Sequence, residues 1–194
     1  MKYCFLVVFS FLLLQACNQG TDYAPKPRGY FRLEFPKKEY QVFDSNSNYS
    51  FEYPKYAKMY LDSLDGNRPN WYNLTFPQFN ARLHLSYYPI ASKKAFNELV
   101  EDSRKLAFKH TVKATGIDEG LIAEKEHNVY GVYYTIDGNT ASSTQFFLTD
   151  STKNYLRAAL YFNEKPQPDS IQPVVNFIKA DIERMIKTFK WKKP

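Results

Sequence analysis

The sequence predicts an α+β protein in which an antiparallel β-sheet is flanked by helices and a long amphipathic helix closes the chain. Two kinds of periodicity lead to this prediction. Residues 129–163 alternate between apolar and polar side chains, as strands with one covered face do. Residues 93–111 and 171–189 instead carry apolar side chains at helical spacing, which predicts two helices.

The alternating region contains three strand-length segments joined by two turns. The turn residues are Asp137-Gly138-Asn139 and Thr149-Asp150-Ser151-Thr152, whose types favour turn geometry. In the last segment, one face carries Leu156, Ala158, Leu160 and Phe162, and the other carries Tyr155, Arg157, Ala159 and Tyr161. We therefore expect a three-stranded meander with a layer packed on one side.

Further strands are expected earlier in the chain. Residues 48–53 form a short strand stopped by Pro54, and Asp65-Gly66-Asn67 marks a turn. Two hairpins are predicted, one from residues 71–76 and 81–88 around Pro77, and one from residues 121–126 and 129–136 turning at His127-Asn128. These strands would extend the meander on both sides.

Ser92 is a suitable N-cap for the first helix, and Asp169 or Ser170 is suitable for the last. The apolar face of the first helix would contain Phe96, Leu99, Val100, Ser103, Leu106, Ala107 and His110. The stripe of the last helix contains Ile171, Val174, Val175, Ile178, Ile182, Met185, Ile186 and Phe189. Such a stripe is usually core, and the alternative is a helix that binds a partner.

Size and composition favour one folded domain over residues 29–194. A chain of 194 residues can bury roughly 70% of its unfolded surface. The 16 Phe, 16 Tyr and 2 Trp residues suit a β-rich core and argue against disorder. The sequence contains no internal repeat and no low-complexity tract.

The N-terminus predicts a lipoprotein signal over residues 1–16, followed by a lipidated tether over residues 17–28. Lys2 precedes a short apolar run, and Leu14-Gln15-Ala16-Cys17 resembles the bacterial lipobox. Acyl chains such as palmitate on Cys17 would anchor the protein in a membrane. The alternative is an ordinary secretory signal with a chance cysteine. Lipidation would leave the mature chain without a free thiol, because Cys4 departs with the signal.

Arg28, Tyr30, Phe31 and Arg32 lie at the end of the tether and directly after it. From Tyr30 to Phe35 the sequence has an extended pattern, in which Tyr30, Arg32 and Glu34 alternate with Phe31, Leu33 and Phe35. Aromatic and arginine side chains dominate interface energetics, so these residues are a candidate partner surface. The alternative is an edge strand, or an extended segment laid on the domain. Removing Lys2 lowers the formal net charge from +6 to +5. This charge suits a soluble basic surface or attraction to anionic lipid or polymer, while export makes nucleic acid an unexpected partner.

The sequence contains no recognisable catalytic, cofactor or metal motif. The histidines His84, His110 and His127 belong to three different predicted elements, without ligand spacing. Turns and strand starts explain the hydroxyls of residues 140–144 and the carboxylates of Asp137 and Asp150. A catalytic pair of carboxylates from residues distant in sequence stays open as an alternative. We expect no cofactor, no small-molecule substrate and no enzymatic activity.

Several long strings resemble the gliding motility lipoprotein family GldD, over essentially the whole chain. They are YAPKPRGYFR at residues 23–32, GNTASSTQFFLTD at residues 138–150, LRAALYF at residues 156–162, the lipobox with Cys17 and the closing amphipathic helix. The departure is Gln15 in the lipobox, which is tolerated there. The resemblance implies a non-enzymatic part of the gliding apparatus, required with the linked type IX secretion system. It also implies partner lipoproteins of the GldB, GldH and GldJ type.

The expected fold also resembles the PsbP/Mog1 type, an antiparallel sheet sandwiched by helices. Asn18 follows Cys17, so the aspartate that retains some lipoproteins in the inner membrane is missing, and no acidic run suggests surface display. We therefore expect the periplasmic face of the outer membrane. Two other functions stay open, a periplasmic binding module for a lipid, glycan or peptide, and a hydrolase of cell-wall material.

Overall fold

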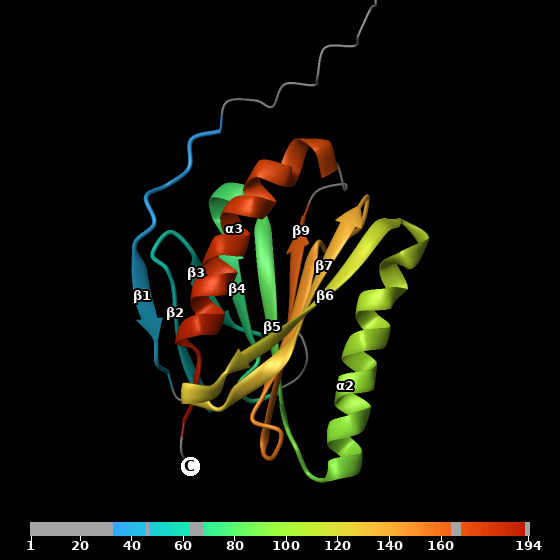
Figure 1. Cartoon of the computed structure of the whole chain (residues 1–194). Coiled ribbons are helices and arrows are strands. Elements are labelled where there is room, and N and C mark those ends of the chain that lie inside the picture. Colours follow the sequence, from blue (N-terminus) through green and yellow to red (C-terminus); the bar gives the residue numbers. More distant parts are fainter. Residues whose placement is uncertain (1–32, 46, 63–67, 164–167, 193–194) are drawn as a thin grey trace, which may run out of the picture. The chain divides into compact units, whose positions relative to one another are not determined.

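The computed structural model describes residues 33–45, 47–62, 68–163 and 168–192, and it shows an α+β fold (Figure 1). A large sheet contains β3 (Lys58–Leu61), β4 (Tyr72–Phe76), β5 (Ala81–Pro89), β6 (Ala114–Glu124), β7 (Val129–Gly138), β8 (Thr144–Thr149) and β9 (Asn154–Phe162). A small sheet contains β1 (Tyr40–Phe43), β2 (Tyr49–Pro54) and β10 (Lys190–Trp191). The helices are α2 (Lys93–Phe108) and α3 (Pro168–Thr188), with 3-10 turns η2 (Pro77–Phe79), η3 (Lys109–Val112) and η4 (Lys125–His127).

All strand pairs are antiparallel, and the large sheet has the order β3-β4-β5-β9-β8-β7-β6. The predicted meander forms its β7-β8-β9 part, and both predicted hairpins are present. The pairing of β5 with β9 joins the two halves of the chain, and it places Leu83 opposite Leu160. The predicted fold class, an antiparallel sheet flanked by helices, is confirmed.

The two faces of the large sheet carry separate cores. Phe146 and Leu148 of β8 belong to the core under α3, whereas Phe147 between them belongs to the core under α2. The small sheet contributes Phe43, Tyr49 and Phe51 to the α3 core, so α3 and the small sheet cover the same face. This division follows from the period-two alternation of the strands.

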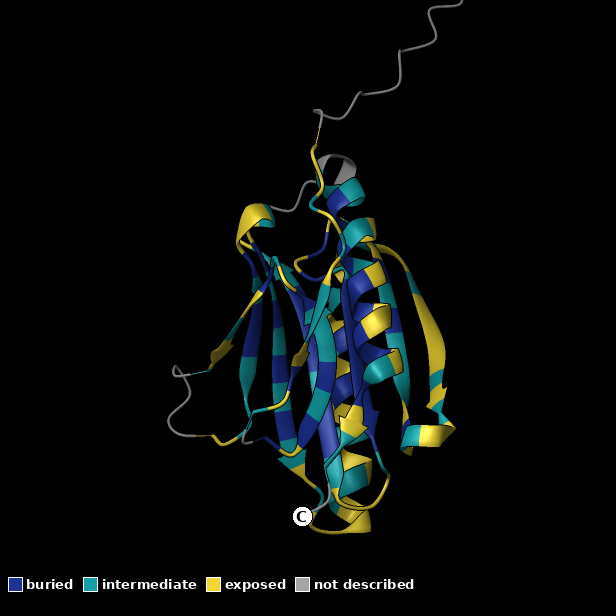
Figure 2. Ribbon diagram, turned by 90° about the vertical axis from the view of Figure 1, so that its left-hand side faces the viewer, coloured by how far each residue is buried: buried dark blue, intermediate teal, exposed yellow. Residues whose placement is uncertain are grey.

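The apolar stripe of α3 is core, as predicted. Every stripe residue except the partly buried Ile171 is buried. Figure 2 shows these buried positions alternating with exposed ones along the helix. The alternative, in which the stripe binds a partner, is therefore wrong for this helix. The seven buried side chains contribute on the order of 10–21 kcal/mol before the loss of chain entropy is subtracted.

Helix α2 begins as predicted and ends earlier than predicted. The side chain of Ser92 accepts a hydrogen bond from the backbone N–H of Ala95 at 3.1 Å, which confirms the N-cap. The α-helix ends at Phe108 rather than residue 111, and η3 continues to Val112. The prediction of Asp169 or Ser170 as the N-cap of the last helix is wrong, because α3 begins at Pro168 and both residues lie inside its first turn. The predicted turn at residues 65–67 lies outside the described part.

Four features of the sheets differ from the prediction. Strands β1, β3 and β10 were not expected, because segments of two to four residues are too short to show periodicity. The strand predicted at residues 121–126 is β6, which begins at Ala114 and runs for 11 residues. Its first part contains Gly116, Asp118, Glu119 and Gly120, and most of it is exposed, so no alternation marks it.

Gly131 marks the closest approach within the β7-β8 pair. A Cβ atom at this position would lie 1.8 Å from the carbonyl oxygen of Phe147, which is backbone and cannot turn away. At Gly120 of β6, the nearest atom to an added Cβ would be the carbonyl oxygen of Tyr133 at 3.9 Å, an ordinary contact.

We expect Gly131→Ala to lower the free energy of unfolding by about 1–3 kcal/mol, because the sheet must distort to admit the methyl group. Gly120→Ala is the matched control and should change the free energy by less than about 0.5 kcal/mol. Urea denaturation of both variants measures the difference. Equal stabilities would contradict the close approach at Gly131.

Candidate functional site

The residues predicted as sites from the sequence precede the described part of the chain. Cys17, Arg28, Tyr30, Phe31 and Arg32 all lie outside the described residues, as do the predicted signal and tether. Lipidation and the partner surface therefore stay predictions. The described chain starts at Leu33, directly after these residues, and the contacts made there determine how anything attached to the N-terminus is joined to the domain.

Residues 33–39 form no strand, which corrects the edge-strand alternative for this part, and they pack on α3 instead. The ring of Phe35 stacks on that of Phe177 with centroids 4.4 Å apart. The ammonium group of Lys38 lies 3.9 Å from the centroid of the same ring and donates a hydrogen bond to the carbonyl oxygen of Phe177 at 2.9 Å. The described residues thus agree with an extended segment laid on the domain.

Four residues, Lys38, Tyr40, Tyr56 and Asp181, form what we call the Asp181 cluster. Lys38 Nζ and Tyr40 Oη donate to one carboxylate oxygen of Asp181 at 2.7 and 2.8 Å. Tyr56 Oη donates to the other oxygen. Asp181 is only 2% exposed, and a buried carboxylate is costly unless charged and polar groups surround it as they do here.

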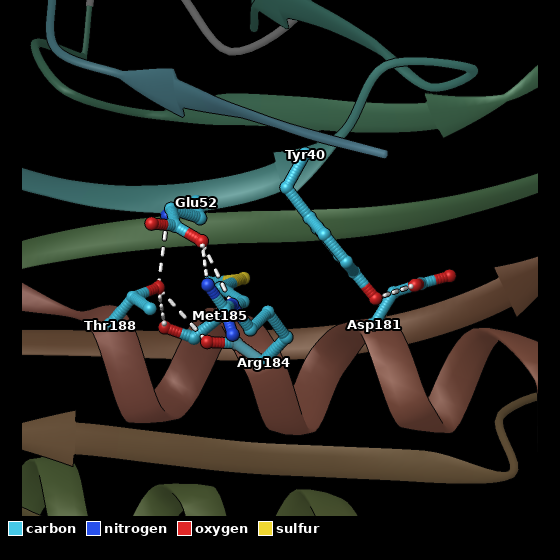
Figure 3. A network of polar contacts seen from close by, with 6 residues as sticks. All are labelled: Tyr40, Glu52, Asp181, Arg184, Met185 and Thr188. Carbon is cyan, nitrogen blue, oxygen red and sulfur yellow. Dashed lines mark hydrogen bonds and ion pairs between the residues drawn. The ribbon is translucent and has the colours of Figure 1, made fainter. Parts of the chain in front are cut away.

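Helical spacing places the cluster on the face of α3 toward the small sheet. Phe177, Asp181, Arg184 and Thr188 are separated by three or four positions, so they lie along one side of the helix. Beside the cluster, Arg184 donates to the Glu52 carboxylate of β2 at 2.8 Å through Nε and contacts it at 2.6 Å through Nη2. The backbone N–H of Glu52 donates to Thr188 Oγ1 at 3.0 Å (Figure 3).

Burial and charge disfavour ionisation of both tyrosines in the cluster. Desolvation, and then the hydrogen bond to Asp181, raise the pKa of Tyr40 to about 12. The same two causes, in the same order, raise the pKa of Tyr56. Both hydroxyls therefore remain donors to Asp181 at neutral pH. The two tyrosine hydroxyls stay protonated, and their hydrogen bonds to Asp181 help to fix the first described segment of the chain to α3.

The histidines and turn residues singled out in the sequence do not form a reactive set. Burial, and then the charges of nearby arginines, lower the pKa of His84; burial and Arg157 do the same at His110. His127 lies apart, beside β2 and α3. Among the described residues, no three His, Cys, Asp or Glu side chains are grouped to hold a metal ion.

Asp150 and two of the four hydroxyls of residues 140–144, those of Thr140 and Ser142, have local partners. Asp150 accepts hydrogen bonds from the backbone N–H groups of residues 152, 153 and 154. Burial alone would raise the pKa of this carboxyl group, and these donors outweigh burial and lower it. The side chains of Thr140 and Ser142 donate to carbonyl oxygens two residues on. Asp137 and Ser143 line a shallow hollow near Lys179. These contacts agree with the turn and strand-start interpretation.

We expect Asp181→Asn to lower the free energy of unfolding by about 1–3 kcal/mol, because buried donors lose a charged acceptor. The control is Glu52→Gln in the neighbouring, more exposed ion pair, which should cost less than about 1 kcal/mol. Denaturant unfolding of the two variants tests this order. A cost at Glu52 equal to that at Asp181 would contradict the assignment.

Alkaline pH should weaken the fold partly through Tyr40. Its contribution is fully present below pH 10, the ordinary tyrosine pKa in the unfolded chain, and is lost as the pH rises toward the folded value of about 12. Tyr40→Phe should therefore make the decline of stability between these pH values shallower. Free energies of unfolding measured across this range for both proteins provide the test, and identical slopes would refute it.

The chain was compared with known proteins and with the requirements of a membrane-spanning helix. None of the helices in the described part combines the length and apolar character needed to cross a bilayer. No curated protein matches the sequence. Among solved structures, the chain is similar to the solution structure of cyanobacterial PsbP (CyanoP) from Synechocystis sp. PCC 6803, with 12% identity and a TM-score of 0.46, over 81% of this chain and 95% of that one.

The family comparison covers nearly the whole described chain. The sequence model of the family described as gliding motility lipoprotein GldD matches residues 20–191. This range contains the Asp181 cluster, both sheets and both helices. The family resemblance noted in the sequence is confirmed, and the chain belongs to the gliding motility lipoprotein GldD family.

Proposed function

We propose that this lipoprotein is a non-enzymatic component of the gliding machinery that acts by contact with partner lipoproteins. Membership of the family makes it a membrane-anchored protein of the cell envelope with a role in gliding. The finer proposal is that it assembles or stabilises lipoproteins of the GldB, GldH and GldJ type. Gliding and the linked type IX secretion would both require it.

The single observation that carries the proposal is the docking of the first described segment on α3. A protein held by a lipid at Cys17 would transmit any pull from the membrane through residues 33–43. The contacts of Phe35 and Lys38 with Phe177 would pass this force to α3. The hydrogen bonds from Lys38 and Tyr40 to Asp181 would do the same. Because α3 lies across the core, a pull on the first described segment would reach the whole domain, as suits a part that positions other parts.

The proposed location is the periplasmic face of the outer membrane. Asn18 after the proposed lipidation site supports export beyond the inner membrane. A lipid on Cys17 would give durable attachment, since several acyl chains at one residue bind far more strongly than one.

Deleting the gene should abolish surface spreading and the secretion of type IX cargo, and it should lower the levels of the partner lipoproteins. Complementation with the wild-type gene should restore all three, whereas Cys17→Ala should restore none and should appear in the soluble fraction. Spreading assays, cargo in the medium, immunoblots and labelling with an alkyne palmitate analogue measure these outcomes. A deletion strain that glides normally would reject the proposal, and membrane-bound Cys17→Ala protein would reject the anchor.

A further inference from the structure

We propose that the outer edge of β6 receives an extended, basic and apolar segment of a partner protein as an additional strand of the large sheet. This inference rests on the proposed function, because it names the surface through which the domain would contact the gliding machinery. The observations behind it are the length of the edge, its exposed side chains, an adjoining groove and its charge.

Strand β6 is an unusually long free edge. Its 11 residues pair with β7, and β6 is the last strand in the order of the large sheet. In the described part of the chain, no further strand pairs with it. The opposite edge, β3, has only four residues. An edge strand presents unpaired N–H and C=O groups, and natural proteins protect long edges by proline, lysine, bulges or covering segments.

The protection of β6 differs from these. The strand contains neither proline nor lysine, its one register shift lies at its start, between Ala114 and Gly116, and the charged side chains along it are all carboxylates. Residues 117–124 therefore form a regular edge, exposed along most of its length (Figure 2). Leu121 in its middle is 90% exposed, so a large apolar side chain faces water where a neighbouring strand would cover it.

A groove adjoins the same edge on the α3 side. Leu121 and Ile122 of β6, Tyr133 of β7 and Ile186 of α3 line it, with Ala123, Glu124, Glu183 and Lys187, and its volume is about 220 Å³. An added strand would direct alternate side chains to the two faces of the sheet. One set would enter this groove, and the other would face the opposite side of the sheet. Strand addition of this kind gains affinity from backbone hydrogen bonds and specificity from such pockets.

The charge of β6 indicates a basic partner. The strand contains Asp118, Glu119 and Glu124 and no cationic residue; Glu119 lies 3.9 Å from Arg104 of α2, which leaves Asp118 and Glu124 as the carboxylates for a basic partner. Opposite charges directly across two strands stabilise the pair, and like charges destabilise it. A second copy of β6 is therefore a poor partner for this edge. If two copies paired antiparallel in any register with its centre between residues 117 and 122, carboxylates of the two copies would lie opposite or diagonal to one another. A partner strand that alternates apolar residues with lysine or arginine fits both the charge and the groove.

The test uses the full-length protein in detergent and two labelled peptides, each long enough to pair with residues 117–124 of β6. One peptide alternates lysine with valine, and the other alternates glutamate with valine. Fluorescence anisotropy should show saturable binding of the lysine peptide. Asp118→Lys should weaken this binding about fivefold or more and strengthen binding of the glutamate peptide. Asp102→Lys on the exposed surface of α2 makes the same net charge change and should leave both affinities within about twofold, because Asp102 belongs to the helix and not to the strand edge that would receive the peptide.

Three results would overturn the inference. They are no saturable binding to the wild-type protein, an equal effect of Asp102→Lys, or self-association of the wild-type protein that Leu61→Asn abolishes. The last result would mean that β3 of a second copy, where Leu61 is 60% exposed, occupies the edge instead. The peptide measurement is independent of gliding, so its failure leaves the deletion phenotype, and with it the proposed function, untouched.

Discussion

A buried carboxylate joins the beginning of the described chain to its last helix. Asp181 is surrounded by donors from Lys38, Tyr40 and Tyr56, which lie more than 120 residues earlier in the sequence. A carboxylate at this depth that lost these donors would be destabilising, and it would become protonated rather than stay charged. The donors therefore favour the docked position whenever the helix is packed. We expect α3 and residues 33–43 to fold together.

The remaining architecture supports this junction. The apolar stripe of α3 buries itself against one face of the large sheet, while Phe43, Tyr49 and Phe51 of the small sheet close the same core from the side. The rings of Tyr49, Phe51 and Phe189 stack on one another, so β2 and the end of α3 are held together by aromatic contact as well. The first described segment is thus fastened to the helix whose apolar stripe is buried in the core. In contrast, the far edge of the sheet ends in a strand that is largely exposed.

Local periodicity made part of this structure predictable. The β7-β8-β9 meander, the β4-β5 hairpin, the Ser92 cap and the stripe of α3 each follow from residues close together in sequence. The small sheet did not, because β1 and β10 contain four and two residues and are defined by pairing with β2. The extent of β6 also escaped prediction, since an exposed edge strand needs no apolar alternation.

The Asp181 cluster was missed for a different reason. Its partners are separated by up to 143 residues, and no spacing rule relates them. A signal was nevertheless present, because Asp181 lies between Ile178 and Ile182 at a position that helical spacing turns toward the buried side. A carboxylate there requires a buried donor, and the lysine and tyrosines of residues 37–60 are natural candidates.

Amide hydrogen exchange in the membrane-bound protein tests the junction most directly. If the docked segment and the core form one cooperative unit, the hydrogen-bonded amides of β1 should exchange as slowly as those of β9, through global unfolding. If the β1 amides exchange much faster while β9 stays protected, the segment opens on its own. The domain would then hang loosely from its anchor, and the central claim would be wrong.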